Sequence, residues 1–318
     1  MTQDQHQPIV VVDGLVKRFA ETTAVDGVSF TIDRGSIFGL LGPNGAGKTT
    51  TISMISCLLA PDEGDALVDG HSIRNDSSGV RRVLGVVPQE IALYPTLTAA
   101  ENLRFWGRMY GLSGKVLSDA VEYGLAMAGL EDQAKKRIDT FSGGMKRRIN
   151  IAAGVLHRPR VLLMDEPTVG IDPQSRNHIL DTVRELNKGG MTVVYTSHYM
   201  EEVEALCDRI AIVDHGRVIA TGTLDELRKL VGDEDRVHIE LAGADGEKAL
   251  EAVRGVPGVT RAEIAEGTLE VLAPQAGPVL GAVVAAITSA GSIVRSVEVV
   301  EPNLESVFLH LTGRALRD

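Results

Sequence analysis

The chain has 318 residues, of which 44% are hydrophobic and 24% are charged. This balance is that of an ordinary globular protein and excludes a disordered chain, while the length predicts two domains of unequal size. The net charge of −11 argues against an extended nucleic-acid surface, because binding to a phosphate backbone needs many Lys and Arg side chains. Cys57 and Cys207 lack disulfide or metal-ligand spacing, so we expect two unrelated buried thiols.

Two segments bear on targeting and membrane insertion. Residues 1–8 are polar and lack the basic and apolar blocks of a signal peptide, so we expect the protein to stay in the cytoplasm. Residues 277–294 consist mostly of Ala, Val, Gly, Ser and Thr. This run falls short of the roughly 20 strongly apolar residues that span a bilayer, and it predicts a packed helix instead.

Residues 1–231 predict an α/β domain. Short apolar runs alternate with amphipathic helical stretches, which is typical of a largely parallel core sheet. Residues 161–164 and 192–195 are nearly continuous in apolar side chains, as expected of central strands that are buried on both faces. The composition of residues 95–154 is helical, so we expect a helical lobe inserted between the strands of this domain.

Some antiparallel structure is expected beside this core. Residues 28–33 alternate between apolar and polar side chains, and residues 66–68 form an apolar run. An Asp69-Gly70 pair follows that run directly, and this pair is a strong signal for a two-residue hairpin turn.

A second domain is predicted for residues 232–318, where acidic residues outnumber basic ones. The expected elements are a strand at 237–241, a helix at 247–253, two strands within 259–272, a helix from 279, a strand that ends at 300, and a last helix at 303–311. The order β-α-β-β-α-β of the first six suggests a small ferredoxin-like α+β domain. Gly313 suits the end of the last helix.

A phosphate-binding loop stands out in the first domain. It follows the apolar strand at 37–41, opens a helical run at 50–59, and reads Gly42-Pro43-Asn44-Gly45-Ala46-Gly47-Lys48-Thr49, with Thr50 completing the predicted nucleotide-binding set. The glycines let backbone N–H groups converge on phosphate oxygens at a helix N-terminus. Lys48 reaches the β- and γ-phosphates and joins the catalytic set, and Thr49 binds Mg²⁺.

Two acidic residues end the strand at 161–164. Asp165 and Glu166 would lie at the carboxyl edge of the sheet, where open α/β folds bind ligands. Asp165 is predicted to hold Mg²⁺. Glu166 is predicted to polarise the water that attacks the γ-phosphate, a role typically worth about 10² to 10⁴ in rate.

These motifs and four others together resemble those of ATP-binding cassette proteins. The others are the signature-like Phe141-Ser142-Gly143-Gly144-Met145, the glutamine-loop segment Val86-Val87-Pro88-Gln89, the aspartate-loop segment Gly170-Ile171-Asp172, and the switch segment Thr196-Ser197-His198. The resemblance covers about residues 9–230 and implies a P-loop nucleotide-binding domain of this type with its inserted helical lobe. Residues 166–173 and 301–308 are most similar to the antibiotic-resistance branch typified by daunorubicin exporters.

The resemblance implies a site shared by two subunits. Ser142, Gly143 and Gly144 would face the γ-phosphate of ATP held by the other subunit, with Asp172 at the same boundary, so a homodimer is expected. Gln89 would contact Mg²⁺ or the attacking water, and His198 would contact the γ-phosphate.

Fewer sequence features bear on recognition of the nucleotide base than on the phosphate site. Phe19 occupies the place where this family usually sets an aromatic ring against adenine, although a core phenylalanine is the alternative interpretation. A guanine-reading Asn-Lys-x-Asp is missing, since Asn187-Lys188-Gly189-Gly190 lacks the acidic member.

The sequence departs from the family pattern in three places. Phe141 and Met145 stand where the common signature has leucine and glutamine, and Gly170-Ile171 replaces a more usual Ala-Leu. The phosphate-contacting serine and glycines and the aspartate are kept.

The leading functional hypothesis is an ATPase subunit, peripheral on the cytoplasmic face of the cell membrane, whose helical lobe docks on a separate transmembrane permease. Export of a hydrophobic drug or antibiotic is implied by the resemblance alone. A cassette ATPase acting on DNA or ribosomes is the alternative, and the acidic charge argues against it. The second domain is expected to regulate the ATPase or to support dimerisation, with ligand sensing as the remaining option.

Overall fold

The computed structural model describes residues 8–230, 234–242, 246–265, 268–300 and 303–313. The described chain forms two compact units, one ending at Leu224 and the other beginning at Asp225. The composition-based boundary at residue 231 lies a few residues further along. None of the described helices is long and apolar enough to cross a membrane.

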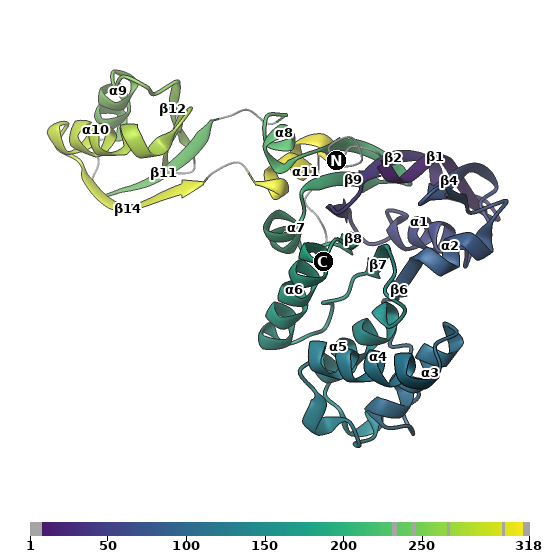
Figure 1. Cartoon of the computed structure of the whole chain (residues 1–318). Helices are drawn as coiled ribbons and strands as arrows, with labels where there is room; N and C mark the ends of the chain where they lie inside the picture. The colour runs from purple at the N-terminus through teal and green to yellow at the C-terminus, as the bar shows by residue number, and fades with distance from the viewer. Residues whose placement is uncertain (1–7, 231–233, 243–245, 266–267, 301–302, 314–318) are drawn as a thin grey trace, which may run out of the picture. The chain divides into compact units, whose positions relative to one another are not determined.

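The first unit contains two sheets and a group of helices (Figure 1). Its strands are β1 (Pro8–Phe19), β2 (Thr22–Asp33), β3 (Ile37–Leu41), β4 (Glu63–Val68), β5 (His71–Ser72), β6 (Leu84–Val87), β7 (Val161–Asp165), β8 (Thr192–Ser197), β9 (Arg209–Asp214) and β10 (Arg217–Gly222). Its helices are α1 (Lys48–Ile55), α2 (Ser77–Val83), α3 (Ala99–Met109), α4 (Gly114–Met127), α5 (Gly143–Val155), α6 (Pro173–Lys188) and α7 (Met200–Leu206).

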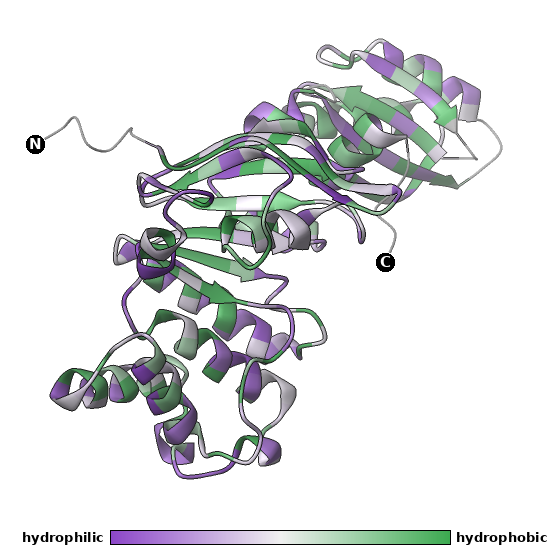
Figure 2. Ribbon diagram, turned by 90° about the vertical axis from the view of Figure 1, so that its right-hand side faces the viewer, coloured by the Kyte–Doolittle hydropathy of each residue, from purple (hydrophilic) through white to green (hydrophobic). Residues whose placement is uncertain are grey.

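The central sheet has the order β10-β9-β3-β8-β7-β6 and is parallel except for the β9–β10 pair. Its strands are coloured as largely hydrophobic in Figure 2. Leu163 packs with α1 on one face, whereas Leu162 and Met164 pack with α6 on the other. The prediction of central strands buried on both faces is therefore confirmed.

The register of the central sheet brings the loops that carry the predicted site motifs to one edge. Leu41 pairs with Ser197, and Asp165 pairs with Thr196. Because parallel strands share one direction, β3, β7 and β8 end at the same edge. The loops that carry the predicted phosphate-binding, acidic and histidine motifs therefore leave the sheet side by side.

The expected antiparallel structure is a second sheet of order β2-β1-β4-β5. Asp69 and Gly70 connect β4 to β5 and both have positive φ, 49° and 83°. Left-handed conformation at both central residues is that of a type I′ hairpin turn, so the sequence signal is confirmed.

The helix after the phosphate-binding loop is shorter than predicted. We expected it at residues 50–59, but α1 begins at Lys48 and ends at Ile55. Cys57 has a φ of 58°, and the N–H groups of Leu58 and Leu59 both turn back to the carbonyl of Ser53. A left-handed residue closes a helix in this way, so the apolar residues that follow belong to a loop. Cys57 and Cys207 are free, as predicted, but they are partly buried and not buried as expected.

The predicted helical lobe consists of α3, α4 and α5, which enclose a hydrophobic cluster of their own. Thr98 caps α3 by accepting a hydrogen bond from the N–H of Glu101, whose carboxylate in turn accepts from the Thr98 N–H. This reciprocal cap sets the start of the lobe.

The second unit has the predicted split β-α-β order. Its elements are α8 (Leu224–Arg228), β11 (Asp235–Ala242), α9 (Gly246–Arg254), β12 (Arg261–Ala265), β13 (Thr268–Ala273), α10 (Ala276–Ser289), β14 (Ile293–Val300) and α11 (Leu304–Thr312). The sheet order β12-β13-β11-β14 is antiparallel throughout, as in a ferredoxin-like domain. Gly313, with a φ of 70°, ends α11 as predicted.

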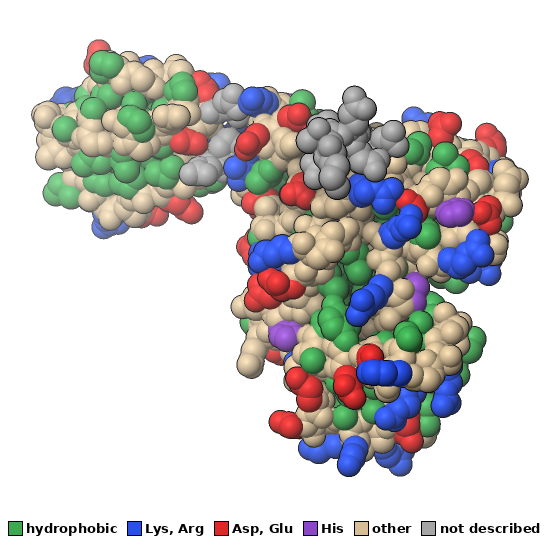
Figure 3. All heavy atoms as spheres, in the orientation of Figure 1, with side chains coloured by type: hydrophobic (Ala, Val, Ile, Leu, Met, Phe, Trp, Pro, Cys, Tyr) green, Lys and Arg blue, Asp and Glu red, His purple; other side chains and the backbone are tan. Residues whose placement is uncertain are grey.

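The weakly polar run expected to form a packed helix includes α10. This helix carries no charged residue and packs against the sheet through Ala276, Val283 and Ile287. Figure 3 shows hydrophobic side chains gathered on the visible face of this unit. The prediction of a packed helix is therefore confirmed for α10.

One carboxylate links three parts of the first unit. Asp69 accepts a hydrogen bond from Arg34 at 2.7 Å and another from Arg160. Burial acts to raise the pKa of Asp69, but the two guanidinium groups outweigh it and hold the pKa below its ordinary value of 3.8. The turn after β4 is thereby tied to the segments before β3 and β7.

We predict that Asp69→Asn lowers the free energy of unfolding by about 1–2 kcal/mol at pH 7, a modest value because both arginines are substantially exposed. A carboxyl group with a lowered folded-state pKa stabilises the fold above its unfolded pKa of about 3.9, and this contribution is lost as the pH falls through the folded value. The difference between the variant and the wild type should therefore narrow below about pH 4. Urea unfolding followed by the fluorescence of Trp106, the single tryptophan, measures both quantities.

Asp119→Asn is the matched control, because Asp119 forms an exposed pair with Lys115 one helical turn away. It should leave the unfolding midpoint unchanged. A gap between Asp69→Asn and wild type that stays constant with pH would contradict the assigned role of the carboxylate.

Candidate nucleotide-hydrolysing site

The phosphate-binding loop takes a backbone form that requires glycine. Gly47 has a φ of 101°, and a Cβ there would collide with the carbonyl oxygen of Ala24. A Cβ at Gly42 would collide with the carbonyl oxygen of Val213. Gly45 has a φ of 80° and faces open space. The glycine spacing thus serves two close backbone approaches and one left-handed turn.

The side chains of this loop divide into buried and exposed ones. Lys48 is buried, and its Nζ donates to the carbonyl oxygens of Gly42 at 2.7 Å and Pro43 at 3.1 Å. Asn44 and Thr49 are exposed. The structure places the remaining loop residues predicted from sequence, Ala46 and Thr50, at buried and partly buried positions respectively.

Three side chains from three loops converge on the carboxylate of Glu166. Lys48 Nζ lies 3.1 Å from Oε1, His198 Nδ1 lies 3.3 Å from Oε2, and Gln89 Nε2 donates to Oε2 at 3.4 Å. The side chains of Lys48 and Glu166 are only 4% and 6% exposed. The sequence predicted all four residues as catalytic, and the structure brings them together.

The backbone at Glu166 is unusual and is fixed by a threonine. Glu166 has a φ of 45°, a region that non-glycine residues rarely adopt and that is often found at functional sites. Its N–H donates to Thr196 Oγ1 at 2.8 Å, and that hydroxyl donates to Asp165 Oδ1 at 2.7 Å. Thr196 therefore fixes the backbone at Glu166 and the direction of the Asp165 side chain. Sequence reasoning gave Thr196 no role, although it lies in the switch segment.

Arg147 also escaped the sequence analysis. Its guanidinium group is buried and donates to the carbonyl oxygens of Pro88 at 2.8 Å and Gln89 at 2.5 Å. Burial lowers the pKa of Arg147 from its ordinary value. The residue belongs to a run of basic residues on α5 that reads as a solvated surface. In the structure it ties the loop of Gln89 to the helical lobe.

A second group of predicted residues lies at the start of α5 and α6. Ser142 caps α5 by accepting from the N–H of Met145, and Asp172 caps α6 by accepting from the N–H of Ser175. This bond from Ser175 is the main cause that lowers the pKa of Asp172, so the carboxylate stays charged. A Cβ on Gly144 would collide with the Ser175 side chain, so the two helix starts pack closely.

The two groups stay separate within one chain. Ser142, Gly143 and Asp172 are exposed, and no hydrogen bond or ion pair of the described residues joins them to the residues around Glu166. Figure 1 shows α5 in the helical lobe, away from α1. The structure therefore places the predicted residues at two different locations on this unit.

Phe19 lies at the end of β1, where it pairs with Thr22 of β2. The phenylalanine is 48% exposed, so the alternative of a core phenylalanine is wrong. Lys17 Nζ lies 5.7 Å from the centre of its ring. The same hairpin contributes Ala24, whose carbonyl oxygen touches Gly47, so the ring is borne by an element that contacts the phosphate-binding loop.

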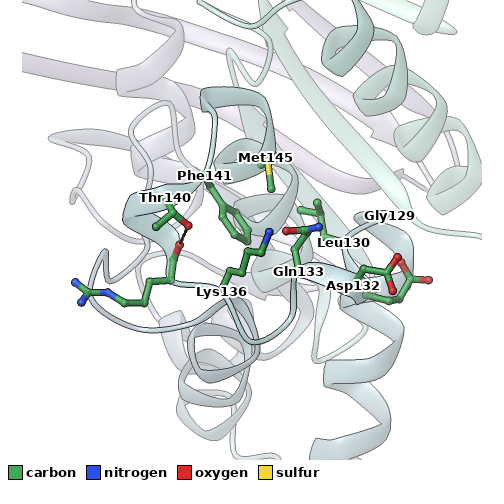
Figure 4. Close-up of a pocket in the computed structure, with 10 residues that line it drawn as sticks. Gly129, Leu130, Asp132, Gln133, Lys136, Thr140, Phe141 and Met145 are labelled. Atoms are coloured by element: carbon green, nitrogen blue, oxygen red, sulfur yellow. Dashed lines mark hydrogen bonds between the residues drawn. The ribbon is translucent and has the colours of Figure 1, made fainter.

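The two departures in the signature segment have a packing role. Phe141 is buried in the hydrophobic cluster of the helical lobe, with Met145 packed against that cluster. Both line a cavity of about 670 Å³ together with Leu130, Gln133 and Lys136 (Figure 4). The larger ring at position 141 therefore fills lobe volume, while Ser142 beside it stays exposed.

Comparisons with known proteins agree with this geometry. Residues 25–169 match the model of the ABC transporter family, and residues 222–312 match that of the C-terminal domain of ATP-binding proteins similar to DrrA1-3. The chain is 51% identical to the linearmycin resistance ATP-binding protein LnrL of Bacillus subtilis, over 96% of this chain and 99% of the relative. It is 40% identical to the daunorubicin resistance ATP-binding protein DrrA3 of Streptomyces coeruleorubidus, over 96% of each chain.

A third relative is the Nod factor export ATP-binding protein I of Ralstonia nicotianae, which is 40% identical over 98% of this chain and 96% of its own. Among solved structures, the ATP-binding subunit of an ABC transporter matches with a TM-score of 0.65 and 32% identity, over 70% of this chain and 93% of that one. The ATP-binding cassette MJ0796, a dimer in a post-hydrolysis state bound to ADP and Pi, matches with a TM-score of 0.62 and 28% identity, over 67% of this chain and 98% of that one. The chain therefore belongs to the ATP-binding cassette family and is the ATP-hydrolysing subunit of a transporter.

Proposed function

We propose that Glu166 is the general base for ATP hydrolysis, in a site completed by a second copy of this chain. The observation that carries the proposal is the convergence of Lys48, Gln89 and His198 on one buried carboxylate. A carboxylate in this setting can accept a proton from a water molecule as that water attacks the γ-phosphate. The three neighbours hold it in place and supply charge and hydrogen-bond donors where negative charge develops.

The residues present fit Mg²⁺ and ATP. His198 Nδ1 is buried and lies 3.3 Å from Glu166 Oε2 without a well-formed hydrogen bond, and Gly45 leaves the loop open where a phosphate would approach. The described residues include no cluster of three or more His, Cys, Asp or Glu able to hold a metal alone. Mg²⁺ commonly binds through one or two protein groups together with substrate phosphates.

We assign the metal to Thr49, Gln89 and Asp165, with ATP phosphates and water as further ligands. The exposed hydroxyl of Thr49 lies in the first turn of α1, and Thr196 orients Asp165. Mg²⁺ bound there would neutralise phosphate charge during transfer. Within this chain, Lys48 binds the phosphates and Glu166 receives the proton.

The second group of residues supports a homodimer. Ser142, Gly143, Gly144 and Asp172 lie apart from the phosphate-binding loop, and most of them are exposed. Facing copies would bring the signature segment of one subunit to the ATP held by the other, so one symmetric interface would complete two sites. The related cassette MJ0796 is a dimer in its post-hydrolysis structure.

We predict that the solution mass of the Glu166→Gln variant doubles when Mg-ATP is added, because two chains associate into a dimer. The amide cannot accept the proton of water, so hydrolysis should slow by at least 100-fold and the ATP-bound dimer should accumulate. Sedimentation velocity with and without Mg-ATP measures this mass. Adding Lys48→Ala to the variant should abolish the doubling, because the phosphates lose their buried cation.

A second test separates the base from the dimer. Ser142→Arg in the Glu166→Gln background should block the doubling while leaving ATP binding by the single chain intact. If Glu166→Gln hydrolyses ATP at the wild-type rate, the assignment of the base is wrong. If its mass does not respond to Mg-ATP, the shared site is wrong.

We assign adenine stacking to Phe19, whose exposed ring is borne by a hairpin that touches the phosphate-binding loop. Stacking of a base on an aromatic ring is worth about 1–3 kcal/mol. Phe19→Ala should therefore raise the KM for ATP by roughly tenfold with little change in kcat. Phe19→Tyr keeps the ring and should retain the wild-type KM, and steady-state ATPase assays distinguish the two. Equal KM values for Phe19→Ala and wild type would contradict the assignment.

We further propose that the chain docks, through its helical lobe, on a separate permease at the cytoplasmic face of the membrane and drives export of a hydrophobic drug or antibiotic. The relatives named for linearmycin resistance, daunorubicin resistance and Nod factor export support this direction and substrate class. Affinity-tagged chain purified from detergent-solubilised native membranes should carry a stoichiometric integral membrane protein. Recovery of the chain alone from these membranes would contradict the proposal.

A further inference from the structure

A buried carboxylate outside the phosphate-binding loop joins several loops of the site. Glu202 on α7 is only 4% exposed. Its Oε2 accepts hydrogen bonds from Thr168 Oγ1 at 2.7 Å, Tyr195 OH at 2.8 Å and Ser197 Oγ at 3.3 Å. A buried carboxylate is costly without such partners, so this cluster is a defined arrangement and not a chance contact.

These three hydroxyl groups belong to segments with proposed catalytic residues. Thr168 follows Glu166 by two positions, and Ser197 directly precedes His198. Burial, with the nearby Glu202 as a second cause, raises the pKa of Tyr195 well above its ordinary value, so the phenol stays protonated and donates. Glu202 thereby connects the chain that leaves β7 to the chain that leaves β8.

The other oxygen of Glu202 faces a cation from α6. Arg176 Nε lies 3.3 Å from Glu202 Oε1 and forms an ion pair with it. The guanidinium carbon of Arg176 lies 5.0 Å from the ring centre of Tyr199, and the Tyr199 ring lies 4.2 Å from that of His198. Arg176, Tyr199 and His198 thus form a continuous series of contacts beside the imidazole, which we call the stack, although the planes of the His198 and Tyr199 rings are tilted by 42°.

The stack also reaches the start of α6. The N–H of Arg176 donates to the carbonyl oxygen of Asp172 at 2.9 Å, so both residues belong to the first turn of that helix. Asp172 is among the exposed residues assigned to the subunit boundary. A displacement of this first turn would therefore move Arg176 and the ring stacked on it.

We propose that Glu202, Arg176 and Tyr199 are positioning residues that hold the imidazole of His198 toward Glu166 and link its orientation to the first turn of α6. The inference rests on the proposed catalytic role of His198. His198 Nδ1 lies 3.3 Å from Glu166 Oε2 but does not meet the geometry of a hydrogen bond, so the direction of its ring also depends on the backbone and on the rings packed beside it. The three residues act through His198 and do not touch ATP.

The experiment compares Arg176→Ala, Tyr199→Ala and the double variant in steady-state ATPase assays. Each single change should lower kcat by roughly tenfold, because a misplaced catalytic group accelerates the reaction less. The KM for ATP should change by less than about twofold. The double variant should be no slower than the slower single variant, because both changes break the same stack. Tyr199→Phe keeps the ring and should restore most of the rate lost in Tyr199→Ala.

Two controls accompany these variants. Lys188→Ala removes an exposed cation on the same helix, paired only with Glu185 in the described structure, and should match wild type. Thermal unfolding followed by Trp106 fluorescence shows whether each variant is folded at the assay temperature. If Arg176→Ala or Tyr199→Ala is not, Glu202→Gln replaces it in the comparison, because it removes the charge that holds Arg176 and keeps the side-chain size.

The inference is overturned if the two single effects multiply in the double variant, if KM rises while kcat is kept, or if Tyr199→Phe is as slow as Tyr199→Ala. His198→Ala is measured in parallel to separate this inference from the proposed function. A wild-type rate in His198→Ala would remove the catalytic role of the histidine and the inference with it. If His198→Ala is slow but the stack variants hydrolyse ATP at the wild-type rate, the inference is wrong while the catalytic role of His198 stands.

Discussion

The buried ion pair between Lys48 and Glu166 is the interaction on which the site depends. Charges so poorly exposed are costly unless each has compensating partners, and here the lysine also donates to two loop carbonyls while the carboxylate meets Gln89 and His198. The pair forms only if the phosphate-binding loop and the loop after β7 approach each other closely.

The central sheet provides that placement. Strands β3, β7 and β8 are adjacent, parallel and in register, so their loops leave from one edge. Thr196 then fixes the left-handed turn at Glu166 and the direction of Asp165 at the same time. The strained backbone persists because the hydrogen bonds and the buried strands around it leave no alternative conformation of comparable energy.

The helical lobe is connected both to the hydrolytic centre and to the exposed signature segment. Arg147 joins the lobe to the carbonyls of Pro88 and Gln89, so a residue that contacts Glu166 is physically connected to α5. The start of α5 also carries Ser142, which is exposed and apart from the loop of its own chain. One helix therefore links the hydrolytic centre to the surface that we assign to the second subunit.

The sequence by itself determined the motifs and the local structure that depends on them. Glycine spacing indicates the loop, the Asp69-Gly70 pair indicates its turn, and apolar periodicity indicates the strands, because each pattern can be recognised within a few consecutive residues. Only the tertiary structure showed that Thr196 contacts Asp165, that Arg147 contacts Pro88 and that Glu202 contacts Thr168, because these partners lie 31, 59 and 34 residues apart in the chain. Polar side chains of these types usually read as surface residues in a sequence. The exposure of Phe19 likewise depends on long-range packing. The early end of α1 depends instead on a local left-handed turn at Cys57, a residue type that does not signal such a turn in a sequence.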